Sequence, residues 1–306
     1  MNSRVIEVGG VLAVLLLSGG FGLFSCSPVN RQPPPVVDAS RALELASEVV
    51  AIGPRPSGSR GALRNAEFIA DHLRGLGLET FVSEWREITP AGELTFRNVI
   101  ANIPGESGEF VLIGCHYDTK RLLSTPGFIG ANDGASGVGL LLAMAEAVVG
   151  SGRKPPLTLK LAFFDGEECV ESYSDHDGLH GSRHLAKELK DAGALSNCRA
   201  MVLLDMVGDK GLNITIPSGS DPKLAKTLLD VAGKQGKGSC FEMRSTDVLD
   251  DHTPFQKAGV PVIDVIDFEF GPSNRYWHTG EDTLDKISAE SLGTVGNAVM
   301  GLVWRL

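Results

Sequence analysis

The sequence predicts an α/β fold with a mixed, mostly parallel central sheet and helices on both of its faces. Apolar runs without alternation, at Phe110–Cys115 and Ala200–Met206, are typical of strands buried on both sides. A third run, Leu159–Glu168, is apolar after Lys160 and stops at Asp165, as expected where a buried strand reaches its carboxyl end. Segments of helical period separate these runs, and strands that alternate with helices indicate a parallel sheet.

The individual elements follow from spacing and from end signals. Asp38 is a suitable N-cap for a helix over Ala39–Val50, and a helix over Ala62–Leu76 is followed by Gly77, which suits a helix C-terminus. The remaining elements, in order, are strands over Leu78–Trp85, Leu94–Ile103 and Phe110–Cys115, a helix over Gly137–Val149, the strand that begins at Leu159, a polar insert, a helix over Ser182–Ala192, a strand over Ala200–Met206, a helix over Lys223–Val231, a strand over Val260–Ile266 and a helix over Ser288–Leu302.

Length and charge limit the possible functions. The 306 residues, 42% of them hydrophobic, are enough for a sizeable core in one large or two small domains. The formal net charge of -10 argues against a nucleic-acid-binding protein, which needs a clustered basic face.

The first 37 residues are expected to lie outside the catalytic part. Arg4 precedes an apolar, Gly-rich run, Val8–Phe24, that is short for a membrane span and suits an export signal. The run ends in Leu-Phe-Ser-Cys, which resembles a bacterial lipobox, although Phe24 is bulky for such a site. We therefore predict an exported lipoprotein with residues 1–26 as the signal, anchored to the cell envelope by a lipid on Cys26, with an uncleaved signal anchor as the alternative. Residues 27–37 are rich in proline and form an extended tether.

The other cysteines do not form a recognisable framework. Cys115, Cys169, Cys198 and Cys240 contain no CxxC pair, and closed zinc-thiolate sites need closely spaced ligand pairs. Export permits disulfides, but the sequence does not pair these four residues.

Polar side chains stand at or just after the predicted strand ends. The carboxyl ends of parallel strands share one edge of the sheet, so these side chains should converge. Histidine with carboxylates suits a catalytic zinc ion. A lone histidine is more often a surface group, and an aspartate before a helix is usually a cap, but the whole set favours a metal site. Its members are His116, Asp118, Asn132, Asp133, Glu167, Glu168, Asp205 and His278.

Other chemistries lack their motifs. The sequence contains no HExxH, no GxSxG and no GxxxxGK. Cys115 and His116 are adjacent and would project in opposite directions from a strand, which argues against a Cys-His nucleophile. Adjacent Glu167 and Glu168 also project in different directions, so one can bind a metal while the other faces the reacting atom.

Seven ordered motifs resemble the zinc-dependent aminopeptidase-like hydrolases, and more closely the animal-type glutaminyl cyclases that share their fold. They are GCHYDTK, GANDGASG, FFDGEE, GLHGSRHLA, LLDMVG, DDHTPF and YWHT. The resemblance runs from about Asp38 to the end and implies a single catalytic domain over 38–306. It implies a glutaminyl-peptide cyclotransferase that uses one zinc ion to convert the N-terminal glutamine of peptides or proteins to pyroglutamate, with release of ammonia.

The resemblance also assigns roles. Asp133, Glu168 and His278 match the ligands of the single cyclase zinc, and Glu167 matches the general acid/base. Asp250 matches a second catalytic carboxylate. Two further residues match ligands of the two-metal aminopeptidases, namely His116 and Asp205, and the latter is a hydrogen-bonding partner in cyclases.

The five-ligand set is therefore intact, and a di-zinc metallo-aminopeptidase is the alternative; a metal-free scaffold would leave the carboxylates repelling one another. The insert Cys169–His180, Asp250 and Trp277, expected as a wall of the substrate pocket, favour the cyclase. Some positions depart from the family: Tyr173 stands where cyclases have a pocket-lining Trp, Asp264 where animal enzymes have a His, and Val138 where a family disulfide partner of Cys115 would be.

Overall fold

The computed structural model describes residues 32–306, so the expected export signal and residues 27–31 of the tether lie outside the described part. The compact unit extends over Pro33–Leu306. It therefore begins five residues before the expected boundary at Asp38. Val37 belongs to this unit, because its side chain is buried in the core and its backbone N–H donates to Asn297 Oδ1 at 3.0 Å. Among residues 32–306, no helix is both long and apolar enough to cross a lipid bilayer.

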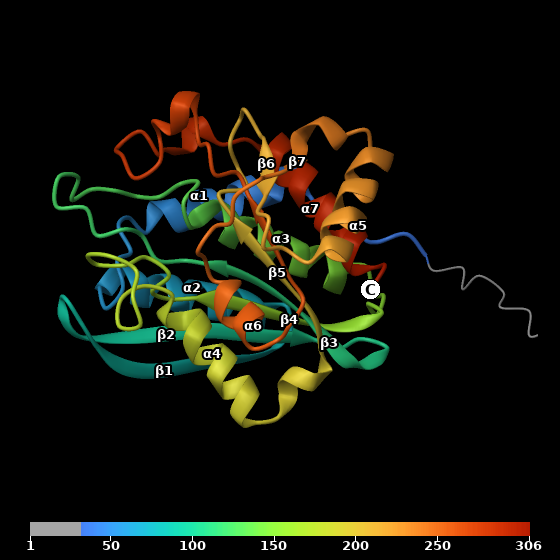
Figure 1. Ribbon diagram of the computed structural model, residues 1–306, viewed down its shortest axis with the longest axis horizontal. Helices are drawn as coiled ribbons and strands as arrows, with labels where there is room; N and C mark the ends of the chain where they lie inside the picture. Colours follow the sequence, from blue (N-terminus) through green and yellow to red (C-terminus); the bar gives the residue numbers. More distant parts are fainter. Residues whose placement is uncertain (1–31) are drawn as a thin grey trace, which may run out of the picture. The chain divides into compact units, whose positions relative to one another are not determined.

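The main sheet has six strands in the order β1-β2-β4-β3-β5-β8 (Figure 1). Four neighbouring strands, β4, β3, β5 and β8, are parallel, whereas β1 and β2 form an antiparallel hairpin that pairs with β4. The predicted mixed, mostly parallel sheet is confirmed. The strands are β1 (Glu79–Thr89), β2 (Gly92–Ile103), β3 (Ser107–His116), β4 (Leu157–Phe164), β5 (Cys198–Asp205) and β8 (Val262–Ile266).

Helices cover both faces because successive strand residues point to opposite sides. Along β3, Val111 and Ile113 lie in the core cluster that includes five helices, whereas Leu112 lies in a second cluster with residues of α4 and α6. The first face carries α1 (Ala39–Ala51), α2 (Arg60–Gly75), α3 (Ala135–Gly150), α5 (Pro222–Lys234) and α7 (Ala289–Val303). The second carries α4 (His180–Asp191) and α6 (Thr253–Lys257).

Local signals agree with most of the predicted boundaries. Asp38 caps α1, since its Oδ1 accepts the N–H of Arg41 at 3.0 Å. Ser59 caps α2 in the same way through Ala62, so this helix begins two residues earlier than predicted. The elements that the sequence did not reveal are short: β6 (Ile214–Ile216), β7 (Phe241–Met243), α6 and the 3₁₀ turns Ala194–Asn197, Gly238–Cys240, Pro272–Asn274 and Leu284–Lys286.

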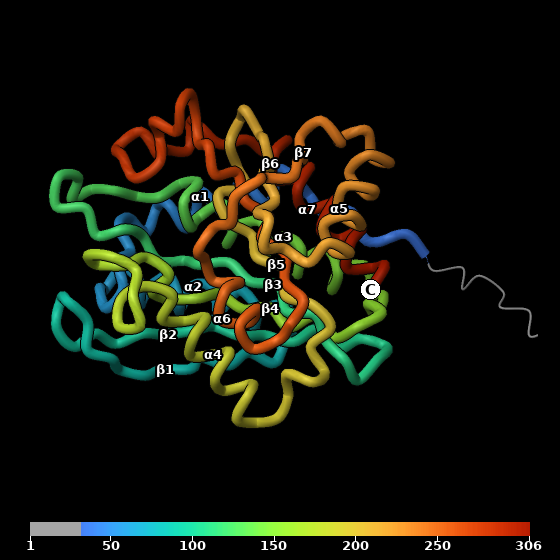
Figure 2. Tube along the Cα trace, viewed as in Figure 1, coloured from blue at the N-terminus to red at the C-terminus, as the bar shows by residue number. Residues whose placement is uncertain are grey.

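The thiols of the described part are unpaired, in agreement with the missing framework. Cys115, Cys169, Cys198 and Cys240 are all free, and the first three are buried. The Cys115 side chain lies against Gly137 of α3, so it points into the core and away from a catalytic role beside His116. The loops that follow β3, β4 and β8 lie toward the left of the view, where these strands end (Figure 2).

Candidate metal-dependent active site

Three predicted ligands converge from three loops. Asp133 precedes α3, Glu168 follows β4 and His278 follows β8. His278 Nε2 lies 3.0 Å from Glu168 Oε1 and 3.2 Å from Asp133 Oδ2. His278 adopts a positive φ of 53°, which is uncommon for a non-glycine residue. This strained backbone conformation is consistent with a requirement for one particular orientation of the His278 imidazole.

A second set shares Asp133 with the first. His116 Nε2 lies 3.2 Å from Asp133 Oδ1 and 3.3 Å from Asp205 Oδ1. The structure therefore brings together all five ligands predicted from the sequence, as two groups of three that meet at Asp133.

These residues fit a metal ion. Donor atoms of a tetrahedral zinc ion, with bonds of about 2.0–2.1 Å, lie about 3.3 Å apart, which is close to the separations found here. Several buried atoms of this cluster lie within ion-pair distance of a neighbouring group but form no hydrogen bond within residues 32–306: both His116 nitrogens, Asp133 Oδ2, Glu168 Oε2 and Asp205 Oδ1. Burial lowers the pKa of His278, but Asp133 and Glu168 outweigh it and raise the pKa to about 10. A bound cation would replace the positive charge of the protonated His278 imidazole beside Asp133 and Glu168.

Two buried carboxylates hold the ligand loops in place. Asp118 accepts the backbone N–H groups of Glu167 at 3.1 Å and Glu168 at 3.3 Å. Asp282 accepts those of Asn132 at 2.7 Å and Asp133 at 3.1 Å. Asp118 was expected at this edge of the sheet, whereas Asp282 was missed, since nothing in its own sequence context indicates a partner about 150 positions away.

Arg55 was also missed. It is fully buried, and its guanidinium donates to the carbonyl oxygens of Tyr117, Ile129 and Gly130 at 2.8–3.1 Å. Burial lowers its pKa to about 10. Arg55 thus ties the segment after β3 to the loop that carries Asp133. A buried arginine of this kind leaves no signal in the sequence, where GPRPSGSRG resembles an ordinary polar loop.

Glu167 lies beside the first ligand set and is 6% exposed. Burial, followed by the charge of Glu168, raises the pKa of Glu167 well above its ordinary value. The hydroxyl of Tyr173 donates to Glu167 Oε1 at 2.8 Å. Tyr173 belongs to the insert Cys169–His180, which Asp177 stabilises by accepting the N–H groups of residues 170–172 at 2.6–3.1 Å.

A cavity of about 300 Å³ opens onto these groups, which is at the small end of the range of ligand pockets. We call it the metal pocket. Trp277 forms part of its wall and stacks on His278, with ring centroids 4.1 Å apart. The lining residues are Asp133, Glu167, Glu168, Tyr173, Asp205, Met206, Arg244, Asp247, Val248, Leu249, Asp250, Ile266, Phe268, Trp277 and His278. All of the predicted catalytic and substrate-binding residues are among them.

Asp264, on β8, is not among the residues that line the pocket. It is fully buried, its two carboxylate oxygens have no hydrogen-bond partner among the described residues, and Oδ2 lies 3.6 Å from His252 Nδ1. Burial is the main cause of a pKa well above the ordinary value for both Asp264 and Asp250.

Lys120 is a further residue that the sequence analysis missed. Its Nζ lies 3.2 Å from Glu168 Oε2 and 3.0 Å from Cys169 Sγ.

The sequence matches the model of peptidase family M28 over residues 98–303. The chain belongs to this family. A glutaminyl-peptide cyclotransferase of Drosophila melanogaster is 32% identical over 261 residues, which cover 76% of this chain and 72% of the relative. The resemblance to the aminopeptidase-like hydrolases, and within them to the cyclases, is confirmed.

Solved structures of similar proteins agree with this assignment. The glutaminyl cyclase of an Acidobacteriales bacterium is 37% identical, with a TM-score of 0.84 over 90% of this chain and 97% of that one. A structure described as a leucine aminopeptidase precursor from Bacteroides thetaiotaomicron is 28% identical, with a TM-score of 0.79 over 89% of this chain and 98% of that one. The α/β fold of this chain is thus shared by proteins named for either activity.

Proposed function

We propose that the protein is a glutaminyl-peptide cyclotransferase that converts the N-terminal glutamine of peptides and proteins to pyroglutamate, with release of ammonia. The observation that carries the proposal is the position of the insert, which places Tyr173 in the wall of the metal pocket with its hydroxyl on Glu167, beside the three ligands. Trp277 and Phe268 leave a small cavity that suits one side chain better than a passing peptide chain.

Asp133, Glu168 and His278 would hold one zinc ion, which when bound would act as a Lewis acid toward the γ-carboxamide oxygen. Of the two ligand sets, this one lines the metal pocket, whereas His116 does not. A substrate in the pocket therefore meets the first set.

Glu167 is proposed as the proton carrier. The α-amine of an N-terminal glutamine closes a five-membered ring on its own γ-carbon, so the reaction needs orientation more than force. Glu167 would accept a proton from the attacking amine and deliver it to the departing ammonia. Its raised pKa suits a group that must both take and give a proton.

Asp250, Asp205 and Trp277 are proposed to orient the substrate. Both carboxylates line the pocket in which the α-amine would be held. Trp277 would act as a flat wall against the glutamine side chain, in keeping with its position against His278. Together they would keep the amine near the γ-carbon and exclude water.

A di-zinc aminopeptidase remains the second candidate, since His116, Asp133 and Asp205 form a complete second set of ligand atoms. The two functions are separated by incubating the full-length protein with matched peptides that begin with glutamine or leucine. The proposal predicts ammonia from the first and no free leucine from the second. Free leucine, and free glutamine without ammonia, would establish the peptidase.

We also propose that the protein is exported and held at the cell envelope by a lipid on Cys26. The supporting observation is the Leu-Phe-Ser-Cys sequence that ends the apolar run before the proline-rich tether. The mass of the mature N-terminus decides this. A diacylglyceryl cysteine at Cys26, lost in Cys26→Ser, is expected; any other first residue contradicts it.

A further inference from the structure

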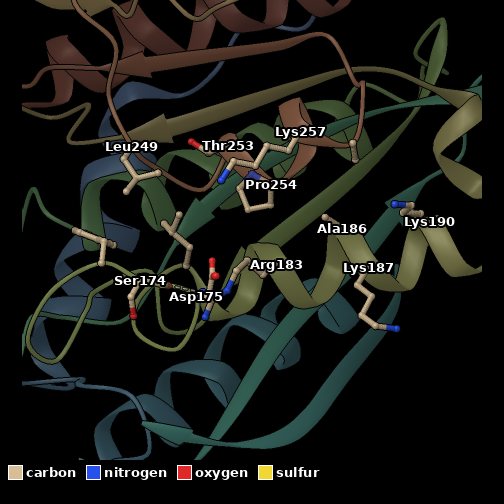
Figure 3. A pocket seen from close by; sticks show the side chains of 13 residues that line it. Ser174, Asp175, Arg183, Ala186, Lys187, Lys190, Leu249, Thr253, Pro254 and Lys257 are labelled. Atoms are coloured by element: carbon tan, nitrogen blue, oxygen red, sulfur yellow. Dashed lines mark hydrogen bonds between the residues drawn. The ribbon is translucent and has the colours of Figure 1, made fainter. Parts of the chain in front are cut away.

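A second cavity adjoins the metal pocket. It has a volume of about 490 Å³ and lies between α4 and α6, as Figure 3 shows. We call it the helix groove. It shares two lining residues with the metal pocket, Tyr173 and Leu249, which are 39% and 50% exposed. These two side chains are therefore a wall common to both cavities, with the groove beginning where the pocket opens.

The groove has an apolar floor and a basic rim. Its remaining lining residues are Ser174, Asp175, Leu179, Arg183, Ala186, Lys187, Lys190, Thr253, Pro254, Lys257 and Ala258. Four of these are basic and one is acidic, in a chain whose formal net charge is -10. A basic patch on an acidic protein is a local feature that overall composition does not explain.

Two of the basic side chains are available for a ligand. Lys187 pairs with Asp191 one turn away, and Arg183 donates to the carbonyl oxygen of Ser174 at 2.7 Å. Lys190 and Lys257 are exposed and form no ion pair with any carboxylate of residues 32–306. They stand on different helices, one on α4 and one on α6, and both line the groove.

We propose that the helix groove binds the part of the peptide substrate that follows the N-terminal glutamine, and that Lys190 and Lys257 favour acidic residues in that part. This inference rests on the proposed function. With glutamine in the metal pocket, the following residues can leave past the shared wall of Tyr173 and Leu249 and enter the groove. An extended chain advances about 3.3 Å per residue, so a few residues can follow it.

Charge complementarity supports this occupant. The metal pocket, with six carboxylates among its lining residues, suits the amino end of a peptide, and the basic groove suits acidic side chains further along. The apolar floor formed by Leu179, Ala186 and Pro254 would contact the chain between them. A single extended peptide can therefore satisfy both cavities at once.

The test uses the full-length protein and peptides that begin with glutamine and carry one glutamate, one internal glutamine or one lysine at each later position in turn. Ammonia release gives kcat/KM. We expect at least one position at which glutamate is preferred over internal glutamine by about 3- to 10-fold, with lysine worse than both, and a preference that weakens as salt is added.

The decisive variant is Lys190→Glu/Lys257→Glu, which should reverse the preference at that position. Its turnover of glutaminamide, which is too short to reach the groove, should equal that of the wild type. The matched control Lys223→Glu/Lys234→Glu makes the same change of net charge on α5, outside both cavities, and should keep the preference for glutamate.

The outcomes separate the two claims. Ammonia release without any charge preference, or with a preference that survives in Lys190→Glu/Lys257→Glu, overturns the proposal that the helix groove binds the substrate peptide. The proposed cyclotransferase activity is unaffected by that result. A protein that releases no ammonia from any of these peptides overturns the proposed function, and this inference with it.

Discussion

The metal pocket and the helix groove share a wall but differ in how they are built. Side chains of the metal pocket come from loops at strand ends, and buried backbone hydrogen bonds to Asp118 and Asp282 hold two of those loops. The groove is formed mainly by two helix faces, and the two free lysines on its rim are exposed. The difference teaches that chemistry depends on a fixed interior, whereas selectivity can depend on a surface that tolerates change.

The largest effect should follow from removing a ligand of the first set. Asp133→Ala, Glu168→Ala or His278→Ala should abolish both activity and bound zinc, because each leaves the ion with fewer than three protein ligands. Metal analysis of the purified variants, alongside the ammonia assay, measures both. His116→Ala should retain much of the activity and one zinc ion per chain. Two zinc ions per chain in the wild type, together with loss of activity in His116→Ala, would instead support the peptidase.

Glu167→Gln should separate chemistry from metal binding within the same pocket. The amide keeps the size and can still accept from Tyr173, but it cannot take a proton, so kcat should fall by about 10²-fold or more. Zinc content should not change, since Glu167 belongs to neither ligand set. Wild-type turnover in this variant would remove Glu167 from the mechanism.

Asp282→Asn tests whether the hydrogen bonds that hold the Asp133 loop contribute to metal affinity. An amide has one acceptor oxygen, so one of the two N–H groups at Asn132 and Asp133 would face an NH₂ group instead. Loss of such supporting contacts typically costs about 10- to 100-fold in metal affinity. Competition with a chelator measures this. Asp285→Asn, an exposed position three residues further on, is the control and should behave as wild type.

Tyr173→Phe perturbs the shared wall and should have the smallest effect on the rate. The hydroxyl donates to the Glu167 carboxylate and favours its charged form, so its removal should raise the pKa of Glu167 further. A base acts only when deprotonated, and the acidic limb of kcat/KM should therefore move to higher pH, by about 0.5–1 unit for one hydrogen bond. Tyr276→Phe removes a hydroxyl outside both cavities and should leave the limb in place. An acidic limb of kcat/KM that stays in place or moves to lower pH in Tyr173→Phe would contradict the role of the Tyr173 hydroxyl in stabilising charged Glu167.

The two cavities also differ in how far the sequence predicts them. Buried strands end abruptly in polar residues, and parallel topology brings their ends together, so His116, Asp133, Glu168 and Asp205 could be placed at one edge of the sheet. Long-range partners could not be placed: Asp282 and Arg55 act through backbone groups of distant loops, which no local pattern encodes. The helix groove could not be predicted from the sequence for a similar reason. Its lysines resemble ordinary solvated charges until α6, a helix too short to show a period, is packed beside α4.

The most direct test of the central claim is the mass of the product formed from a glutamine-initiated peptide in water enriched in the heavy oxygen isotope. Cyclisation predicts a peptide lighter by one ammonia molecule that carries no heavy oxygen, because the attacking group is the peptide's own amine. A peptide shortened by its first residue, or one in which glutamine has become glutamate with heavy oxygen incorporated, would contradict the cyclase.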